Sequence, residues 1–436
     1  MSAPEITTAE KYRQYLNLSS IASIEPVTID HGLGAKIWDT SGKQYIDCFA
    51  GISVVNSGHS DPRILAAARA QMDRFVHCGT LLYEVPVVAD LAQKLAEISP
   101  GRLQKTFFCN SGAEAVEGAL RLAKAHTGRS DFIALQGSFH GRTNATLSVT
   151  GNRQRKQRGG PYLPGVAFAP TPHPYRCRMC HGRCDLQCAE AVRDVIEFQT
   201  SGEVAAFIAE PLMGEGGIIV PPPGYFERVK RILDEFGILL IVDEVQSGFG
   251  RTGKLFGIEH YAVEPDIMCM AKGIADGFPL GGFIARPEVA DSFRPGEHLS
   301  TFGGNPVCCA AAVANIEVID SDNLCQRSSD LGSWLKAQLE SLAARHSVIG
   351  DVRGRGLMMG LELVEDRQSK RPAAKLAGHV KASLRERGVL VGVGGHFGNV
   401  VRLQPPLVID PGDLGLVTET LDAVLEDALA NSAIDG

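Results

Sequence analysis

The sequence lacks both an apolar run long enough to cross a membrane and a strong net charge. No uninterrupted apolar stretch reaches the roughly 18 residues that a membrane helix needs, so no membrane span is expected. The net charge of −7 over 436 residues argues against a nucleic-acid footprint. The start of the chain, Met1–Ile6, has neither a basic segment nor an apolar core, so no secretory signal is expected. An internal repeat and a low-complexity linker are also missing.

The number of cysteines is odd, which argues against a framework of paired disulfides. There are eleven, most of them in apolar contexts, which predicts a protein of the reducing cytoplasm. Four of them follow a compact spacing, Cys177-x2-Cys180-His181-x2-Cys184-x3-Cys188. Thiolates at such spacings can bind zinc or an iron–sulfur centre. We favour free thiols or a loop staple over a structural metal, and we predict no metal in the functional site.

Strand and helix patterns alternate through the middle of the chain. Strands are expected at 106–109, 132–135, 204–209, 238–243 and 266–273, with helices at 113–126 and 225–236. This alternation predicts an α/β fold with a mostly parallel central sheet and helices on both faces. We place the large domain at residues 66–320 and expect residues 1–65 and 321–436 to meet in a small α+β domain.

The two chain ends carry their own signals. Asp61-Pro62 is expected to cap one helix and Asp410-Pro411 to begin the last one. Residues 351–360 and 400–403 are expected to be strands.

Two buried strands end in charged residues. The first is Ile238–Asp243, and the second runs from Asp266 to Lys272-Gly273. A continuous apolar run is typical of a parallel strand buried on both faces, where an unpaired charge is costly. Open α/β sheets bind their ligands at the carboxyl ends of such strands. A lysine whose pKa burial can lower, paired with a carboxylate, suits Schiff-base chemistry on pyridoxal phosphate. Taken singly, either residue is more often a cap or a solvated chain end.

Further polar motifs follow other strands or turns, and each also has a plain structural interpretation. Asn110–Ala115 sits where a strand turns into a helix and can hold a phosphate, or it is a capping box. Phe139–Arg142 can stack on a ring and bind a carboxylate, or it is a core Phe beside a surface Arg. Glu210–Gly217 offers two acids in a glycine-rich loop that can serve a site, or Glu215 is a solvated loop acid. Thr301–Pro306 can contact an anion, or it is a plain turn. The basic run 152–158 is interpreted as a solvated loop in preference to a guide for an anionic substrate.

Together these residues resemble the class III aminotransferases, the ω-aminotransferase branch of the fold-type-I pyridoxal-phosphate enzymes. The specific part is 241–253, Ile-Val-Asp-Glu-Val-Gln-Ser-Gly-Phe-Gly-Arg-Thr-Gly, together with Met270-Ala-Lys-Gly-Ile274. The resemblance implies roles in cofactor binding for these residues: Lys272 holds the cofactor covalently and shuttles the proton, Asp243 pairs with the ring nitrogen, Phe139 and Val245 flank the ring with His140 nearby, Gln246 and Glu210 bind its polar edge, and Ser111, Gly112 and Ala113 hold the phosphate.

The same resemblance implies a substrate site. Arg142 would bind the carboxylate of an ω-amino acid, Ile52 would form an apolar wall, and Glu215 would pair with Arg402 as a gate for an α-carboxylate. Thr301 would reach the phosphate of the neighbouring subunit in a homodimer or a dimer of dimers. Met213 and Phe139 depart from the pattern of many 4-aminobutyrate enzymes, which have Gln and Tyr there.

The resemblance predicts an aminotransferase that moves the amino group of an ω-amino acid, 4-aminobutyrate first, to 2-oxoglutarate by a ping-pong mechanism. Alanine–glyoxylate or β-alanine–pyruvate transfer is the nearest alternative, because residues 348–357 and 388–392 also resemble alanine–glyoxylate enzymes. A racemase or an aminomutase would use the same lysine. A non-enzymatic module organised by the cysteines is a third class, against which the Asp243 and Lys272 pair argues.

Overall fold

A seven-stranded sheet forms the centre of the described chain. In the computed structural model, which describes residues 6–19, 24–180 and 184–432, its order is β4-β10-β9-β8-β7-β5-β6. The strands are β4 (Lys105–Cys109), β5 (Asp131–Leu135), β6 (Val166–Ala169), β7 (Val204–Ala209), β8 (Leu239–Asp243), β9 (Ile267–Met270) and β10 (Gly281–Ala285). The pairings from β9 across to β6 are parallel, whereas β10 is antiparallel to both neighbours. The predicted α/β fold with a mostly parallel sheet is confirmed.

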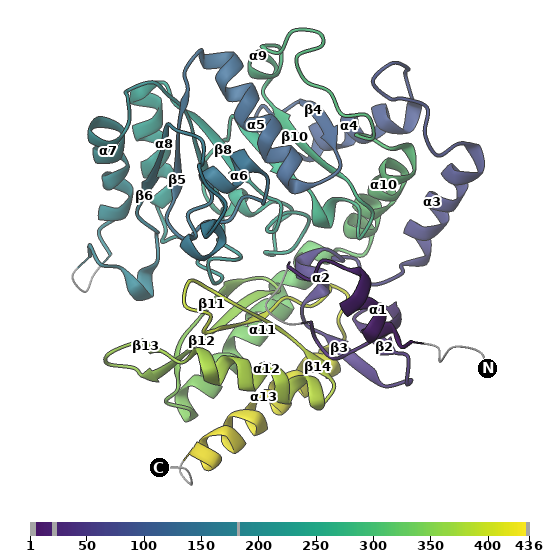
Figure 1. Cartoon of the computed structure of the whole chain (residues 1–436), viewed down its shortest axis with the longest axis vertical. Helices are drawn as coiled ribbons and strands as arrows, with labels where there is room; N and C mark the ends of the chain where they lie inside the picture. Colours follow the sequence, from purple (N-terminus) through teal and green to yellow (C-terminus); the bar gives the residue numbers. More distant parts are fainter. Residues whose placement is uncertain (1–5, 20–23, 181–183, 433–436) are drawn as a thin grey trace.

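Helices cover both faces of this sheet (Figure 1). Helix α5 (Gly112–Thr127) packs with alternate strand residues such as Leu239 and Ile241, while α7 (Gln187–Gln199) and α8 (Tyr225–Phe236) pack in the cluster that holds Leu240 and Val242. Because successive side chains of a strand point to opposite faces, β8 must be apolar up to Asp243 at its end. The continuous apolar run in the sequence therefore reflects burial on two sides.

Two smaller sheets contain strands from the chain ends. The first has the order β1 (Ile29–Leu33), β2 (Lys36–Asp39), β3 (Gln44–Asp47) and β14 (Val389–Leu390). The second has the order β11 (Ile349–Arg355), β12 (Met358–Asp366), β16 (Val400–Leu403) and β15 (Gly392–Gly394), with β13 (Arg371–Pro372) paired to β12. Figure 1 shows them below the central sheet, with the N-terminal segment beside the C-terminal helices. The domain limits at 65/66 and 320/321 stay predictions.

The remaining helices are α1 (Thr8–Tyr15), α2 (Ala50–Ser53), α3 (Pro62–Arg74), α4 (Pro86–Ile98), α6 (Asn144–Val149), α9 (Pro287–Ala290), α10 (Pro306–Ser321), α11 (Leu324–Arg345), α12 (Ala374–Glu386) and α13 (Pro411–Ser432). As predicted, α3 begins behind an Asp61 cap, whose carboxylate accepts the Arg63 amide at 2.8 Å, and the last helix begins at Pro411. No helix in the described ranges combines the length and apolarity that a membrane crossing needs.

The expectation of one strand over residues 351–360 is wrong. Two antiparallel strands, β11 and β12, meet there in a hairpin whose turn lies at Gly356 and Leu357. Gly356 has φ +54, and a Cβ at this position would lie 2.4 Å from the carbonyl carbon of Thr252. The turn therefore needs a glycine both for its backbone conformation and for its close approach to the large sheet's loop.

Arg251 joins the large sheet's loop to both chain ends. Its side chain is fully buried, and its guanidinium donates to the carbonyl oxygens of Leu357 and Pro405 and, at 2.6 Å, to Asn56 Oδ1. Burial lowers the pKa of Arg251 to about 9. A buried cation of this kind is tolerated because Nη1 and Nη2 both donate to buried acceptors, although Nε has no hydrogen-bond partner among the described residues.

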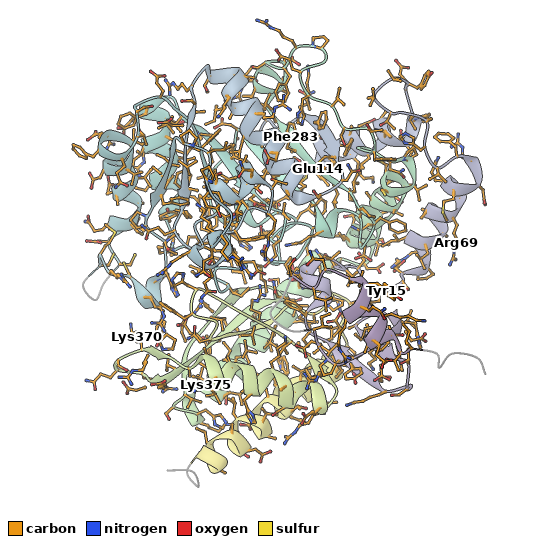
Figure 2. The ribbon with its side chains drawn as sticks, in the orientation of Figure 1. Tyr15, Arg69, Glu114, Phe283, Lys370 and Lys375 are labelled. Carbon is orange, nitrogen blue, oxygen red and sulfur yellow. The ribbon has the colours of Figure 1, made fainter. Side chains whose placement is uncertain are left out.

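We therefore expect Arg251→Met to lower the free energy of unfolding by about 3 kcal/mol or more, because buried acceptors lose their donor. Urea unfolding followed by circular dichroism measures it. Arg69→Met, at an exposed position on α3 (Figure 2), is the matched control and should change stability by less than about 0.5 kcal/mol. Equal stability of the two variants would contradict the role given to Arg251.

Candidate active site

The carboxyl ends of the parallel strands bring the predicted site residues to one edge of the sheet. Asp243 ends β8, Glu210 follows β7, His140 lies in the segment after β5, and Lys272 follows β9. The four charges act on one another in the structure: Asp243 and Glu210 raise the pKa of Lys272, and the charge of His140 acts on Glu210. This is the edge at which open α/β sheets bind ligands.

Asp243 is held in a fixed orientation by two donors. Its Oδ2 lies 2.7 Å from His140 Nδ1, and its Oδ1 accepts the backbone amide of Val245 at 3.0 Å. The carboxylate and the imidazole are both buried, and His140 Nε2 is a buried nitrogen without a hydrogen-bond partner in the described structure. The pair thus presents an oriented negative charge in a place closed to water, where charge acts strongly.

Lys272 occupies a strained backbone position within this group of charges. It opens a 3-10 turn directly after β9 with φ +48, a value that favours glycine. Burial lowers the pKa of Lys272, and the charge of Arg402 lowers it further. The carboxylates nearby act in the opposite direction and raise this pKa; they are Glu215, Asp243 and Glu210. A lysine of lowered pKa is the nucleophilic form that Schiff-base chemistry requires.

Glu210 organises the loop that follows β7. Its Oε1 accepts the Phe139 amide at 3.1 Å, and its Oε2 accepts the Gly214 amide at 2.8 Å. Burial raises the pKa of Glu210 to about 7, with the charges of His140 and Asp243 acting in opposite directions. One carboxylate therefore fixes the backbone of two loops that lie beside Lys272.

The N-terminus of α5 faces the same edge. Ser111 is its N-cap and accepts the Glu114 amide at 3.2 Å, so the predicted cap exists. Val245 packs directly on the backbone of Gly112, where a Cβ would lie only 2.9 Å from its Cγ1. The first turn of a helix offers amide donors and a positive dipole end, which suit a phosphate next to Ala113.

Glu215 and Arg402 form the contact that the resemblance implies. Glu215 Oε1 accepts Arg402 Nη1 at 2.8 Å, and the Arg402 guanidinium lies over the Phe49 ring with 5.1 Å to its centroid. Burial alone would raise the pKa of Glu215, but Arg402, Lys272 and Arg155 hold it below its usual value. Whether this pair selects substrates stays a prediction.

The interpretation of residues 152–158 as a solvated loop is wrong at Arg155. Its Nη2 donates to Glu215 Oε2 at 3.3 Å, so the basic run reaches the site. No local pattern predicts this contact with Glu215, because a loop arginine meets its partner only through the fold.

The other predicted substrate residues lie around these groups. Arg142 is exposed, with its guanidinium over the Phe139 ring at 5.7 Å; burial and the charge of Arg155 lower its pKa, and Glu215 raises it. Ile52 is 40% exposed in the α2 turn and has φ +70, a strained value for a β-branched residue. Thr301 lies exposed on the loop before α10.

Gln246 forms a hydrogen bond with Gln404, a residue that the sequence analysis did not predict for the site. Gln404 Nε2 donates to Gln246 Oε1 at 3.2 Å, and both side chains are buried. Gly214 lies against the Gln246 amide so closely that a Cβ there would lie 1.8 Å from Oε1. Gln404 follows β16 and Gln246 follows β8, so this contact joins two sheets.

All eleven cysteines are free thiols in the structure. Within residues 6–180 and 184–432, apart from 20–23, no group of three or more His, Cys, Asp or Glu side chains is arranged to hold a metal ion. His181 of the cysteine motif lies outside the described residues. The Cys180 amide donates to Cys177 Sγ at 3.3 Å, which gives this segment a turn of its own.

The assembled residues fit pyridoxal phosphate. The aldehyde needs a primary amine of lowered pKa, which Lys272 supplies. The ring nitrogen needs a buried, oriented carboxylate, which Asp243 supplies with His140 behind it. The phosphate needs a helix N-terminus, and a Cβ at Gly281 would lie 2.5 Å from the Ser111 carbonyl oxygen, so a glycine is needed for β10 to approach that turn.

Comparisons with known proteins agree with this geometry. Residues 20–425 match the family model described as Aminotransferase class-III. The chain is 42% identical to an alanine–glyoxylate aminotransferase 2 homolog, mitochondrial, of Arabidopsis thaliana, over 91% of this chain and 82% of the relative. It is 42% identical to an acetylornithine aminotransferase of Methanopyrus kandleri, over 93% of this chain and 95% of the relative. It is 37% identical to the Escherichia coli 4-aminobutyrate aminotransferase GabT, over 94% of this chain and 95% of the relative.

A solved structure of a Bacillus anthracis aminotransferase superposes with a TM-score of 0.91 at 33% identity, covering 96% of this chain and 97% of that one. The sheet order, the charged strand ends and these relatives lead to one conclusion. The chain belongs to the class-III aminotransferases, enzymes that use pyridoxal 5'-phosphate to transfer amino groups between amino acids and 2-oxo acids.

Proposed function

We propose that this enzyme transfers the amino group of an ω-amino acid, 4-aminobutyrate first, to 2-oxoglutarate by a ping-pong mechanism. The observation that carries the proposal is the Glu215–Arg402 pair at 2.8 Å, with Arg142 exposed nearby and in electrostatic contact with Glu215. Arg402 is thus masked by a carboxylate that Arg155 also contacts, whereas Arg142 lies over the Phe139 ring. Arg402 and Arg142 suit two substrates whose carboxylates lie at different distances from the reacting amine.

In this proposal the two substrates use different arginines. An ω-amine carries a single, distant carboxylate, which Arg142 binds while Glu215 keeps Arg402 occupied. 2-Oxoglutarate and glutamate also carry an α-carboxylate close to the reacting carbon. For these substrates Glu215 turns away, and Arg402 binds the α-carboxylate with two parallel hydrogen bonds.

The reaction itself divides between cofactor and protein. When bound, pyridoxal 5'-phosphate supplies an aldehyde for the amino group and a ring that withdraws electrons from the reacting carbon. Lys272 Nζ would hold the cofactor until the amine of the substrate displaces it, and the freed amine of lowered pKa would then move the proton as a base. Asp243, oriented by His140 and the Val245 amide, keeps a proton on the ring nitrogen. Phe139, Val245 and Gln246 orient the ring, and Ser111, Gly112 and Ala113 hold its phosphate.

The proposal includes a homodimer in which Thr301 completes the phosphate site of the partner subunit. Two neighbouring segments around Thr301 support it: Thr80 Oγ1 donates to the Gly303 carbonyl at 2.8 Å, and the rings of His77 and Phe302 lie 5.3 Å apart. These segments expose large apolar side chains, namely Leu81, Leu82, Tyr83, Leu299 and Phe302. Apolar surface of this kind is typical of a protein interface. We also propose that the protein is located in the cytoplasm, because all its cysteines are free thiols.

A second candidate donor is N-acetylornithine, an ω-amine with a larger acylated end. The observation that favours it is the 42% identity to a relative named acetylornithine aminotransferase. The alanine–glyoxylate alternative is likewise favoured by the 42% identity to the Arabidopsis relative. One methylene in a pocket is worth only about 1–3 kcal/mol, so substrate comparison has to decide.

A matrix of donors against acceptors tests the proposal. The donors are 4-aminobutyrate, N-acetylornithine, β-alanine and L-alanine, and the acceptors are 2-oxoglutarate, pyruvate and glyoxylate. We expect the highest kcat/KM for 4-aminobutyrate with 2-oxoglutarate, because Arg142 and Arg402 suit its two carboxylate positions. A higher kcat/KM for L-alanine with glyoxylate would assign the enzyme to that reaction, and a higher kcat/KM for N-acetylornithine would make it the donor. Conversion of an L-amino acid into its D-enantiomer without an acceptor would indicate a racemase.

We expect Asp243→Asn to fold normally and to lose at least about 100-fold in kcat, because a neutral amide cannot stabilise the protonated ring nitrogen. Steady-state transfer rates measure it, with cofactor content checked by absorbance. Asp291→Asn is the control, since Asp291 pairs with Lys105 at an exposed site away from the sheet edge. Near-normal turnover of Asp243→Asn would remove this residue from the mechanism.

Arg402→Ala should slow the half-reaction with 2-oxoglutarate far more than that with 4-aminobutyrate. Two hydrogen bonds to a carboxylate in a shielded pocket are worth about 2–4 kcal/mol, so the selective loss should be tens- to hundreds-fold. Single-turnover rates with each substrate measure it, and Arg371→Ala, at a 71% exposed arginine, is the control. Equal loss in both halves would refute the gate.

A further inference from the structure

Glu215 lies on a loop whose backbone is closed on itself. Met213 and Ile219 exchange two backbone hydrogen bonds, at 3.0 and 3.1 Å, and the Gly217 and Ile218 amides donate to the Gly214 carbonyl. Residues 213–219, called here the gate loop, therefore move as one unit. Whatever fixes this unit also fixes where the Glu215 carboxylate points.

The small sheets hold the gate loop through its backbone. Arg353 of β11 donates from Nε at 2.9 Å and from Nη2 at 2.6 Å to the single carbonyl oxygen of Gly217. The Gly395 amide donates to the Glu215 carbonyl at 3.2 Å. Gly217 has φ +113, and a Cβ there would lie 3.1 Å from Gly395 Cα and 3.3 Å from Arg353 Nη2. The loop is thus fitted closely to this support.

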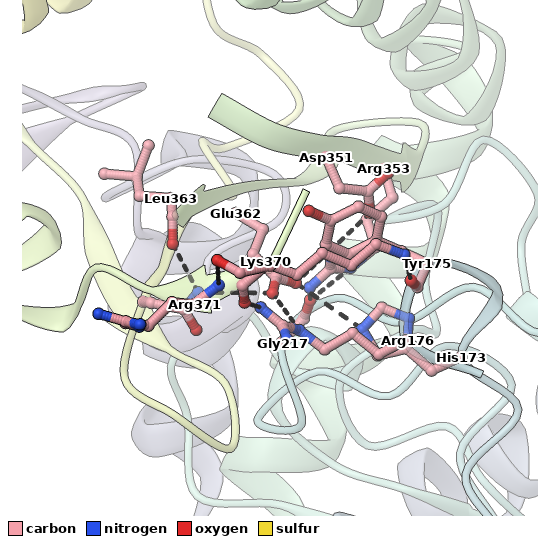
Figure 3. Close-up of polar contacts among 12 residues, drawn as sticks. His173, Tyr175, Arg176, Gly217, Asp351, Arg353, Glu362, Leu363, Lys370 and Arg371 are labelled. Carbon is pink, nitrogen blue, oxygen red and sulfur yellow. Dashed lines mark hydrogen bonds and ion pairs between the residues drawn. The ribbon is translucent and has the colours of Figure 1, made fainter. Parts of the chain in front are cut away.

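Arg353 is itself held by two carboxylates. Its Nη1 lies 2.7 Å from Asp351 Oδ2 and 2.7 Å from Glu362 Oε2, and the guanidinium is almost fully buried (Figure 3). Burial alone would raise the pKa of Glu362, but His173, Arg353 and Arg176 hold it far below its usual range. Glu362 is therefore ionised, and Arg353 stays oriented toward Gly217.

Arg176 makes the second half of this charge network without contacting the gate loop by hydrogen bonds. Its Nε donates to Glu362 Oε1 at 2.5 Å and its Nη2 to the Lys370 carbonyl at 2.8 Å (Figure 3). Two guanidinium groups thus balance two carboxylates. A crevice of about 530 Å³ lies beside the network and is lined by Gly216 and Ile219, so the loop has space into which it can move.

We propose that Arg353 is a positioning residue for substrate selection: it fixes the gate loop in the position where Glu215 covers Arg402. This rests on the proposed function, since it explains how the Glu215–Arg402 pair is kept closed. Arg353 lies on β11 and reaches the loop's backbone rather than substrate. Its loss should loosen the closed arrangement that an ω-amine needs and spare the open one that an α-carboxylate needs.

Arg353→Lys tests this with the holoenzyme. An ammonium keeps the charge opposite Glu362 but cannot give two N–H bonds to the Gly217 carbonyl while it serves both carboxylates. We expect the single-turnover rate with 4-aminobutyrate to fall about tenfold, as for one lost charged hydrogen bond, and the rate with L-glutamate to change by less than about threefold. We also expect faster amide hydrogen exchange at residues 213–219, a readout that does not depend on activity.

Two matched variants separate positioning from general damage. Arg176→Lys disturbs the same Glu362 carboxylate without touching Gly217, and it should leave the ratio of the two rates and the loop's exchange near wild type. Asp351→Asn keeps the Arg353 guanidinium but removes one of its orienting carboxylates, so it should shift the ratio in the same direction by less. This variant also serves if Arg353→Lys folds poorly.

A double variant completes the test. In a Glu215→Gln background the charged pair is gone, so Arg353→Lys should change the ratio by less than about twofold further. Equal slowing of both half-reactions by Arg353→Lys with unchanged exchange, while Arg402→Ala stays selective, would overturn the positioning role and leave the proposed function intact. An unselective Arg402→Ala would refute the gate and, with it, this inference.

Discussion

Charge compensation in a space with little water holds this site together. The charges of Asp243, Glu210, Glu215 and Arg402 all act on Lys272 at the edge of the central sheet. A single buried charge of this kind would be costly, whereas paired and hydrogen-bonded charges are tolerated. The same low polarity that demands partners also lowers the pKa of Lys272 and raises that of Glu210 to about 7. The reactivity of the lysine therefore follows from how its surroundings are balanced.

The residues predicted to bind the cofactor lie on the central sheet, and the arginines proposed to select substrates lie on the smaller sheets. Asp243 and Lys272 lie at strand ends of the large sheet, while Arg402 and Arg353 lie on β16 and β11. Glu215 lies on the loop after β7 of the large sheet, but its partners belong to the small-sheet segments: Arg402 pairs with its carboxylate and the Gly395 amide donates to its carbonyl oxygen. This division is consistent with one chemistry serving relatives that bear several substrate names.

Local patterns failed where contacts between distant segments decided the structure. Residues 351–360 were predicted to form one strand, because the turn at Gly356 has no local breaker beyond glycines that also occur within strands. The short strand β10 was not expected, since Gly281-Gly282 lowers strand propensity while making room for the Ser111 turn. Arg155 looked like a solvated charge, and only its meeting with Glu215 gives it a place in the site.

The sequence by itself determined the α/β class, five central strands, the starts of α3 and α13, and the placement of Asp243 and Lys272 at the ends of buried strands. These follow from periodicity, capping residues and charges placed at the ends of buried runs, which are properties of neighbouring residues. Only the tertiary structure decided that His140 orients Asp243, that Gln404 meets Gln246 and that Arg353 holds Gly217. Each of these contacts joins segments at least a hundred residues apart in the chain, and such distances are closed by sheet topology and packing rather than by any local pattern.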